Sequence, residues 1–319
     1  MNDMTSVSRV ADREPDPQIR PRRTGTATTL AFLTPGVLLF TLLFAVPATI
    51  ILAYSFATRD TYGGVIWHFD LDAYSQFFGF PNADLLRDWD FTYLNIVIRS
   101  SLLALSTAMA ALVLAYPAAW YISRQSFRRK YLLLLLVTLP FFINGLVRIY
   151  AWMLILRSDG LINHALLAVG LIDKPLQMIY TLPAVAASMV YQYLPFMVLP
   201  LFSSIEKMDF RLVEASLDLG AGRFTTMRRV VIPLTMPGIV AGVVLVFIPA
   251  LGNFIAPTLI GGAKDLQIGT LLAQSFLAAR DWPFGSAVAT ILGVIVVACL
   301  YLVARAEGKT VMSSTGKEH

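Results

Sequence analysis

Long apolar stretches, separated by short clusters of charged residues, run through most of the chain. Five stretches contain no charged residue and are long enough to cross a bilayer as a helix: 24–58, 100–123, 175–205, 230–263 and 282–304. A sixth stretch, 131–156, is interrupted only by Arg148. A helix needs about 20 apolar residues to cross the hydrocarbon core. The pattern therefore predicts six membrane-spanning helices.

The predicted domain organisation follows from these stretches. We place the six spans at about 30–56, 95–123, 131–156, 178–205, 236–260 and 284–305, within one all-α membrane domain of residues 30–305. Residues 1–29 are polar and rich in proline and arginine, which predicts a disordered tail, and residues 306–319 form a second tail. The uncharged stretches 160–172 and 266–279 are too short to span, so we expect interfacial or re-entrant helices there.

Composition agrees with a membrane protein and excludes several kinds of chemistry. Of 319 residues, 57% are hydrophobic and 14% are charged, whereas soluble domains have about 25% charged residues. The single cysteine, Cys299, excludes an internal disulfide and a thiolate metal cluster. The three histidines lie outside the predicted spans, and no zinc-protease motif or nucleophile elbow occurs. We therefore expect no catalytic residue and no metal site.

The basic residues predict the orientation of the chain in the membrane. Loops on one side carry five, four, five and three Lys or Arg residues, and the alternate loops carry two each. Arg99 and Arg148 are not counted because they fall within predicted spans. Since cytoplasmic loops are enriched in basic residues, both termini are predicted to lie in the cytoplasm.

Two absences limit the classes of membrane protein to which the chain could belong. No Asp or Glu falls within the six predicted spans, and this disfavours an ion-coupled secondary transporter, which needs buried acidic groups to bind its coupling ion. The sequence Gly308-Lys309-Thr310 resembles the end of a phosphate-binding loop, but Val303 stands where its first glycine belongs. ATP hydrolysis, if it drives transport, must then occur on another polypeptide.

The longest cytoplasmic loop, about 206–237, has an amphipathic pattern. Asp209 precedes apolar residues at near-helical spacing, and Gly220 follows them, so a short helix is predicted between the two. A second short helix is predicted over 223–231, after which Pro233 and Pro237 are expected to turn the chain back into the membrane. An amphipathic surface helix of this kind docks on a partner or on the lipid surface.

This loop carries a recognisable motif. It reads Glu214-Ala215-Ser216, then Gly220 after three residues, then Val230, Ile232 and Pro233 after nine more. The pattern resembles the EAA loop of ABC-importer permeases; Glu214, Ala215, Gly220 and Pro233 match it, and Ser216, Val230 and Ile232 are conservative departures. The resemblance implies a coupling loop at 206–235 whose helix inserts into a cleft of a separate ATPase. The residues expected to couple are Glu214, Ala215, Ser216, Asp218, Gly220, Arg223 and Pro233.

Other segments are similar to the spermidine/putrescine type of these permeases. They are residues 140–142, 148–152, 194–200, 247–254 and 281–285. The resemblance covers about 30–305 and implies the type I importer permease fold in a bacterial inner membrane. Its implied partners are a dimer of ATPase chains that hold ATP and Mg, a periplasmic solute-binding protein, and a second permease that is a related chain or a second copy. It implies no cofactor on this chain.

The solute remains open at this point. Polyamines are implied by the resemblance, but Asn253 stands where many members of this subfamily carry glutamate. Opine-like or amino-acid-derived solutes therefore stay in contention, as does a membrane scaffold or sensor that docks the ATPase without transporting.

Pathway residues are predicted mainly from Arg148, which lies within the third span. A charge at this depth costs several kcal/mol, so it must face a cavity, a carbonyl or a partner. Trp152 is one turn further and shares its face, and an indole can hold an ammonium group. The further candidates are Tyr150, Tyr191, Tyr193, Asn253 and Phe254, with packing or interfacial anchoring as the alternative role for the aromatic ones.

Overall fold

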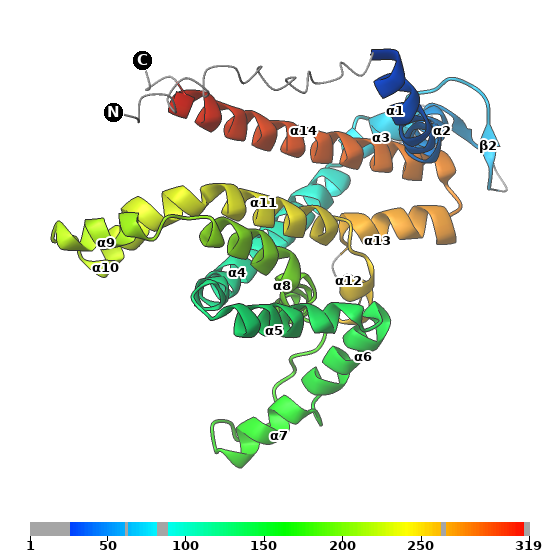
Figure 1. Ribbon diagram of the computed structural model, residues 1–319. Coiled ribbons are helices and arrows are strands. Elements are labelled where there is room, and N and C mark those ends of the chain that lie inside the picture. The colour runs from blue at the N-terminus through cyan, green and yellow to red at the C-terminus, as the bar shows by residue number, and fades with distance from the viewer. Residues whose placement is uncertain (1–25, 61–62, 82–88, 263–265, 316–319) are drawn as a thin grey trace, which may run out of the picture. The chain divides into compact units, whose positions relative to one another are not determined.

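The computed structural model describes residues 26–60, 63–81, 89–262 and 266–315 (Figure 1). Predicted disorder over 1–25 and the end of the second tail, 316–319, lie outside these residues. Residues 26–29 and 306–315, which were predicted to belong to the tails, are helical. By its internal contacts the chain divides into two units, Met1–Ile50 and Ile51–His319, and each is described by itself.

The first unit contains helix α1 (Thr26–Phe40), the π-helical turn η1 (Thr41–Ala45) and the start of α2 (Val46–Tyr54). Its side chains form a wide apolar surface: Leu38, Phe40 and Leu43 are all more than 60% exposed. Residues 33–54 are long and apolar enough to cross a membrane. A helix that is apolar all round requires an apolar solvent, which lipid provides.

In the second unit, the end of α2 is followed by a small two-stranded element. Strands β1 (Thr58–Arg59) and β2 (Val65–Ile66) pair antiparallel, and helix α3 (Asp72–Phe78) follows them. Gly79 ends α3 in the left-handed conformation at φ 75°, where an added Cβ would collide with the carbonyl of Asp90. Glycine is therefore required at this turn.

Three long helices form the core of the second unit. They are α4 (Thr92–Ser123), α8 (Leu182–Glu206) and α11 (Ile232–Leu251), and each packs against the other two. One face of α4 is a ladder of fully buried alanines: Ala104, Ala108, Ala111, Ala115 and Ala119. Small side chains let helix backbones approach closely where no hydrophobic effect drives association.

Two glycines produce the same close approach between α11 and α8. A Cβ on Gly238 would lie 2.4 Å from the Cβ of Ser204, and one on Gly242 would lie 2.7 Å from the sulfur of Met197. Glycine is thus the residue that fits the α8–α11 contact at both positions.

The third predicted span is not a single helix. Helix α5 (Phe127–Thr138) and the 3₁₀ turn η2 (Leu139–Phe142) are followed by α6 (Gly145–Leu156) and α7 (Leu161–Ala168), with a 90° bend between the pairs. Pro140 has no N–H to continue the helix, and Ile143 is extended at ψ 139°. The Asn144 side chain then accepts a hydrogen bond from the Leu146 N–H and begins α6.

Short helices precede the last long one. They are α12 (Ile255–Leu259), α13 (Ile268–Ala273) and the π-helical turn η4 (Gln274–Ala278), before α14 (Trp282–Thr315). Helices therefore occur at both stretches where interfacial or re-entrant elements were predicted. In the described residues, five helices are long and apolar enough to cross a membrane, or six if the bent pair is one span.

Candidate functional site

Helix α9 (Arg211–Asp218) follows α8 in the sequence, within the loop that carries the EAA-like motif, and Figure 1 shows it beside α10. Asp209 accepts a hydrogen bond from the Arg211 N–H at 3.0 Å, but Phe210 is the capping residue, so Asp209 stands one position earlier than a cap. Leu219 ends the helix, and Gly220 follows at φ 84°. Glycine adopts this left-handed conformation without strain, which explains why the helix ends here.

The two faces of α9 have different surroundings. Val213 is buried in a small cluster with Met208 and Val231. Glu214, Ala215 and Asp218 are exposed, and Leu219 just beyond the helix is 88% exposed. An acidic and apolar surface is therefore left open on the side that does not pack.

The chain after α9 differs from the predicted short helix and turn. Helix α10 (Arg223–Thr226), the π-helical turn η3 (Met227–Val231) and α11 form one continuous helix, Arg223–Leu251. The prediction that Pro233 and Pro237 turn the chain is wrong. Pro233 lies in the first turn of α11, directly after the π-helical turn, which changes the hydrogen-bond register so that a missing N–H is tolerated there.

The residues of the EAA-like motif are held together by one side-chain hydrogen bond. The hydroxyls of Ser216 and Thr226 are 3.0 Å apart and join α9 to α10. An open groove of about 530 Å³ beside this bond is lined by Leu212, Ala215, Ser216, Leu219, Ala221, Arg229, Val230, Pro233 and Leu234. Six of the seven predicted coupling residues lie within α9, α10 or the turn between them, and Pro233 lies on the wall of this groove.

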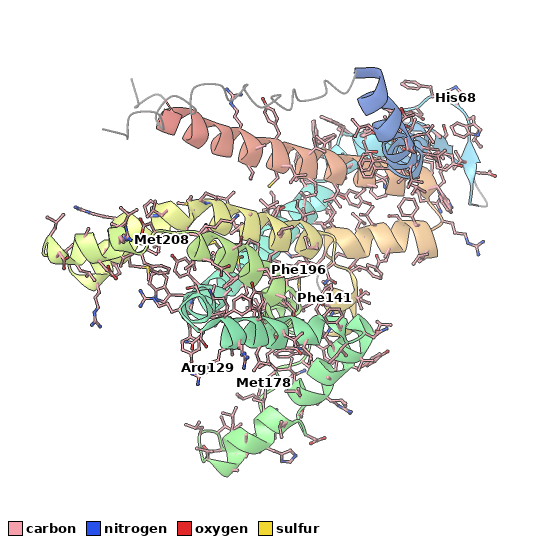
Figure 2. The ribbon with its side chains drawn as sticks, in the orientation of Figure 1. His68, Arg129, Phe141, Met178, Phe196 and Met208 are labelled. Atoms are coloured by element: carbon pink, nitrogen blue, oxygen red, sulfur yellow. The ribbon has the colours of Figure 1, made fainter. Side chains whose placement is uncertain are left out.

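A second group of predicted residues surrounds the bend between α5 and α6. Arg148 lies in the first turn of α6, and its Nε is buried without a hydrogen-bond partner among the described residues. Its guanidinium is 5.9 Å from the Phe141 ring, and that ring lies 5.1 Å from Phe196 of α8. Figure 2 shows Phe141 and Phe196 close together. The cation therefore borders an aromatic surface built from the bend and α8.

A hydrogen-bond chain connects α8 to the end of α11. The Asn253 amide donates to the Tyr193 hydroxyl at 2.9 Å, and that hydroxyl donates to the Pro249 carbonyl at 3.1 Å. The other end of the Asn253 amide accepts from the Ala256 N–H at 3.1 Å and begins α12. Asn253 thus holds the short helix in place as well as contacting Tyr193.

Of the other pathway candidates, two form an aromatic pair and two have exposed side chains. Trp152 meets Tyr191 edge to face, with ring centroids 5.8 Å apart. Tyr150 is 54% exposed and Phe254 is 43% exposed, and neither forms an aromatic pair with another described ring. The structure therefore brings together Trp152 with Tyr191, and Tyr193 with Asn253.

Phe141 and Phe196 were not among the predicted pathway residues. The signal for Phe141 was present, because Pro140 followed by aromatic residues and then Asn144 and Gly145 is typical of a helix end and a new helix start. No local pattern marks Phe196, whose contact spans more than 50 residues. In the part of the chain that the structure describes, no group of three or more His, Cys, Asp or Glu side chains is placed to hold a metal ion.

Comparison with known proteins identifies relatives that cover most of the chain. The sequence profile of the family described as binding-protein-dependent transport system inner membrane component matches residues 111–308. The spermidine/putrescine transport system permease protein PotB of Escherichia coli (strain K12) is 43% identical over 249 residues, which cover 78% of this chain and 86% of that protein.

A second PotB, from Haemophilus influenzae (strain ATCC 51907 / DSM 11121 / KW20 / Rd), is 38% identical over 280 residues, covering 87% of this chain and 92% of that protein. Among solved structures, a chain from the crystal structure of a bacterial ABC transporter that imports the acidic polysaccharide alginate superposes with a TM-score of 0.60. The two chains are 18% identical, and the match covers 88% of this chain and 96% of that one. They therefore share a fold.

Proposed function

The chain belongs to the family of binding-protein-dependent transport system inner membrane components, and from this premise we propose that it is the permease subunit of an ATP-driven importer for a polyamine such as spermidine or putrescine. The identity of 43% to a spermidine/putrescine permease supports this solute. As a non-catalytic subunit, the chain would supply the pathway and the coupling surface, while ATP and Mg bind to a separate pair of ATPase chains.

The observation that carries the proposal is helix α9. It presents Glu214, Ala215 and Asp218 on an exposed face, and its other face is fixed to the transmembrane helices through Val213. A helix with one anchored and one open face can receive force from a partner and pass it on. We propose that this open face inserts into a cleft of the ATPase.

Two contacts would transmit the movement of α9 to the spans. The Ser216–Thr226 hydrogen bond joins α9 to the helix that continues into α11. The Lys130 ammonium and the Glu206 carboxylate, 2.8 Å apart, tie the start of α5 to the end of α8. Closure of the ATPases on ATP would then shift α5, α8 and α11 together, and the pathway would open outward; hydrolysis would reset it.

The pathway would run past the bend between α5 and α6. The rings of Trp152, Tyr191, Phe141 and Phe196 offer an aromatic and neutral surface, and Tyr193 is buried next to Phe196. An ammonium over an aromatic face gains about 0.5 to 2 kcal/mol, which is enough to guide a polyamine and too little to trap it. Arg148 would limit how closely a cation approaches, and Tyr150, Asn253 and Phe254 would complete the lining from this chain.

The proposed partners follow from the same reasoning. A solute-binding protein would deliver the polyamine on the external side, and a second, related permease would supply the other wall of the pathway. Both termini would lie in the cytoplasm, since the basic loops are on their side of the membrane.

The test is reconstitution of the complete complex in proteoliposomes, with the binding protein outside and ATP inside. We expect uptake of radiolabelled putrescine or spermidine that requires ATP, the ATPase and the binding protein. An opine and an amino acid serve as matched solutes. Uptake of either one in place of the polyamines would overturn the solute, and gradient-driven uptake by this chain without the ATPase would overturn the importer.

A further inference from the structure

A pocket with two arginines lies next to α9, on the opposite side from the groove that contains Pro233. It has a volume of about 480 Å³ and is lined by Trp120, Arg124, Val213, Leu217, Arg223, Thr226, Met227 and Val231. These residues come from the end of α4, from α9 and from the continuous helix that begins at Arg223. We call this set the arginine pocket.

The two guanidinium groups in the arginine pocket have no carboxylate partner among the residues that the structure describes. Arg124 stacks over Trp120, with its guanidinium carbon 4.4 Å from the ring centroid, and it lies 5.5 Å from the Phe210 ring. Stacking holds the side chain in place while its N–H groups, at the edge of the plane, stay open to an acceptor. No ion pair joins Arg124 or Arg223 to a carboxylate of the described residues.

The position of both arginines along their helices places the pocket near the membrane surface. Arg124 directly follows the apolar helix Thr92–Ser123, and Arg223 is the first residue of the apolar helix Arg223–Leu251. Trp120 lies one turn inside the end of the first of these helices, and tryptophan is enriched at the level of lipid headgroups. With the orientation proposed above, the pocket lies at the depth of the headgroups of the cytoplasmic leaflet.

The remaining walls fit the part of a lipid next to its headgroup. Val213, Leu217, Met227 and Val231 are apolar, and Trp120 adds an aromatic ring. Two guanidinium groups match the oxygens of a phosphate, which accepts paired hydrogen bonds from arginine. We infer that the arginine pocket binds the phosphate of an anionic phospholipid, with the start of an acyl chain against its apolar wall.

An anionic lipid is favoured over a zwitterionic one by charge. Two arginines without carboxylate partners leave an excess of positive charge that a zwitterionic headgroup does not neutralise. The cytoplasmic leaflet concentrates anionic lipids, and each basic residue near its surface adds about 1 kcal/mol of attraction. Free phosphate offers the same chemistry but has no group for the apolar wall.

Lipid in this pocket would also steady α9, because Val213 and Leu217 belong to that helix. This consequence rests on the proposed role of α9 in coupling. The binding of lipid does not depend on that role. Because the experiment below uses no nucleotide and no ATPase, a failure of lipid binding is distinguishable from a failure of the proposed function.

The test compares two double variants of the full-length chain, purified in neutral detergent. Arg124→Gln with Arg223→Gln removes the pocket charges. Arg128→Gln with Arg129→Gln is the matched control, because it removes two exposed charges from the first turn of α5 that do not line the pocket. The fraction of chains that retain added phosphatidylglycerol is measured by native mass spectrometry.

We expect the pocket variant to retain about tenfold less phosphatidylglycerol than wild type, and the control to retain nearly as much as wild type, since charge-assisted hydrogen bonds to phosphate are lost only in the first. Phosphatidylcholine should be retained weakly by all three chains, and inorganic phosphate should not displace the bound lipid at equal concentration. Equal losses in both variants, no loss in either, or displacement by inorganic phosphate would overturn the proposal. Circular dichroism of each variant verifies that its helices are intact.

Discussion

The core helices and helix α9 bury very different shares of their residues. Helix α8 places Met189, Met197, Leu201 and Ile205 where they are fully buried, whereas α9 buries only Val213 of its eight residues. Each core helix is held by close side-chain packing along its buried face, so its position is fixed by the other two helices. Helix α9 has one anchored side, so a partner can hold its open face. This contrast separates residues that maintain the fold from residues that are exposed and can contact a partner.

The largest expected effect is on the stability of the core. We expect Gly238→Val to lower the free energy of unfolding by several kcal/mol, because even its Cβ would collide with Ser204 and overpacking alone costs about 1 to 3 kcal/mol. Thermal unfolding in detergent measures the change. Gly252→Ala is the control, since a Cβ there has nothing within 4 Å. A Gly238→Val chain as stable as the control would mean that the α8–α11 contact is loose.

Helix α9 should show the opposite behaviour, a loss of activity without a loss of stability. We expect Glu214→Lys to reduce ATP-driven uptake by at least about tenfold, since reversing one charge at an interface typically costs more than 1.4 kcal/mol. Its unfolding temperature should match that of wild type, because Glu214 is exposed and unpaired within the described residues.

The control for Glu214→Lys is Thr225→Lys, which adds a positive charge at an exposed position of α10. Uptake should persist in this variant. Normal uptake in Glu214→Lys would show that the open face of α9 does not contact the ATPase.

The Lys130–Glu206 pair joins the start of α5 to the end of α8, the core helix that precedes α9, and its expected effect on stability is smaller. A double-mutant cycle with Lys130→Gln and Glu206→Gln should give a coupling energy of about 0.2 to 1 kcal/mol, which is typical of a partly exposed ion pair. The carboxylate side chain is 41% exposed and the ammonium side chain 16% exposed. Additive effects of the two substitutions on unfolding would remove this pair from the route between α9 and α5.

The smallest expected effect lies at the start of α4. Hydrogen bonds from the side chain and the backbone of Thr92 lower the pKa of Asp90 below its ordinary value of 3.8. A lowered pKa means that the carboxylate stabilises the fold above pH 3.8 and that this contribution is lost as the pH falls through the folded-state pKa. Asp90→Asn should therefore unfold slightly earlier than wild type at neutral pH and equally at the acid end of a thermal titration. A difference that grows on acidification would contradict this assignment.

Long apolar stretches were sufficient to predict where most helices lie, because burying the backbone in lipid requires a helix of known length. The bend at 139–144 was not predicted, since apolarity is the same on both sides of it. The continuous helix through Pro233 was not predicted either, because a proline inside a helix is tolerated here only next to the π-helical turn, which no local pattern marks.

The candidate site could be predicted from the sequence only in part. Spacing along one helix located the coupling residues near Glu214, where neighbours in sequence are neighbours in space. The contacts of Tyr193 with Asn253 and of Phe141 with Phe196 join segments more than 50 residues apart. Such contacts depend on how the helices pack, which no local pattern contains.

The right-angle break between α5 and α6 limits what can surround it. A helix that stops partway leaves its last carbonyls without partners, and lipid tails cannot supply them. Protein or water must therefore cover residues 139–144. In a bilayer, this side of the chain would therefore have to face protein or a water-filled cavity and not lipid tails.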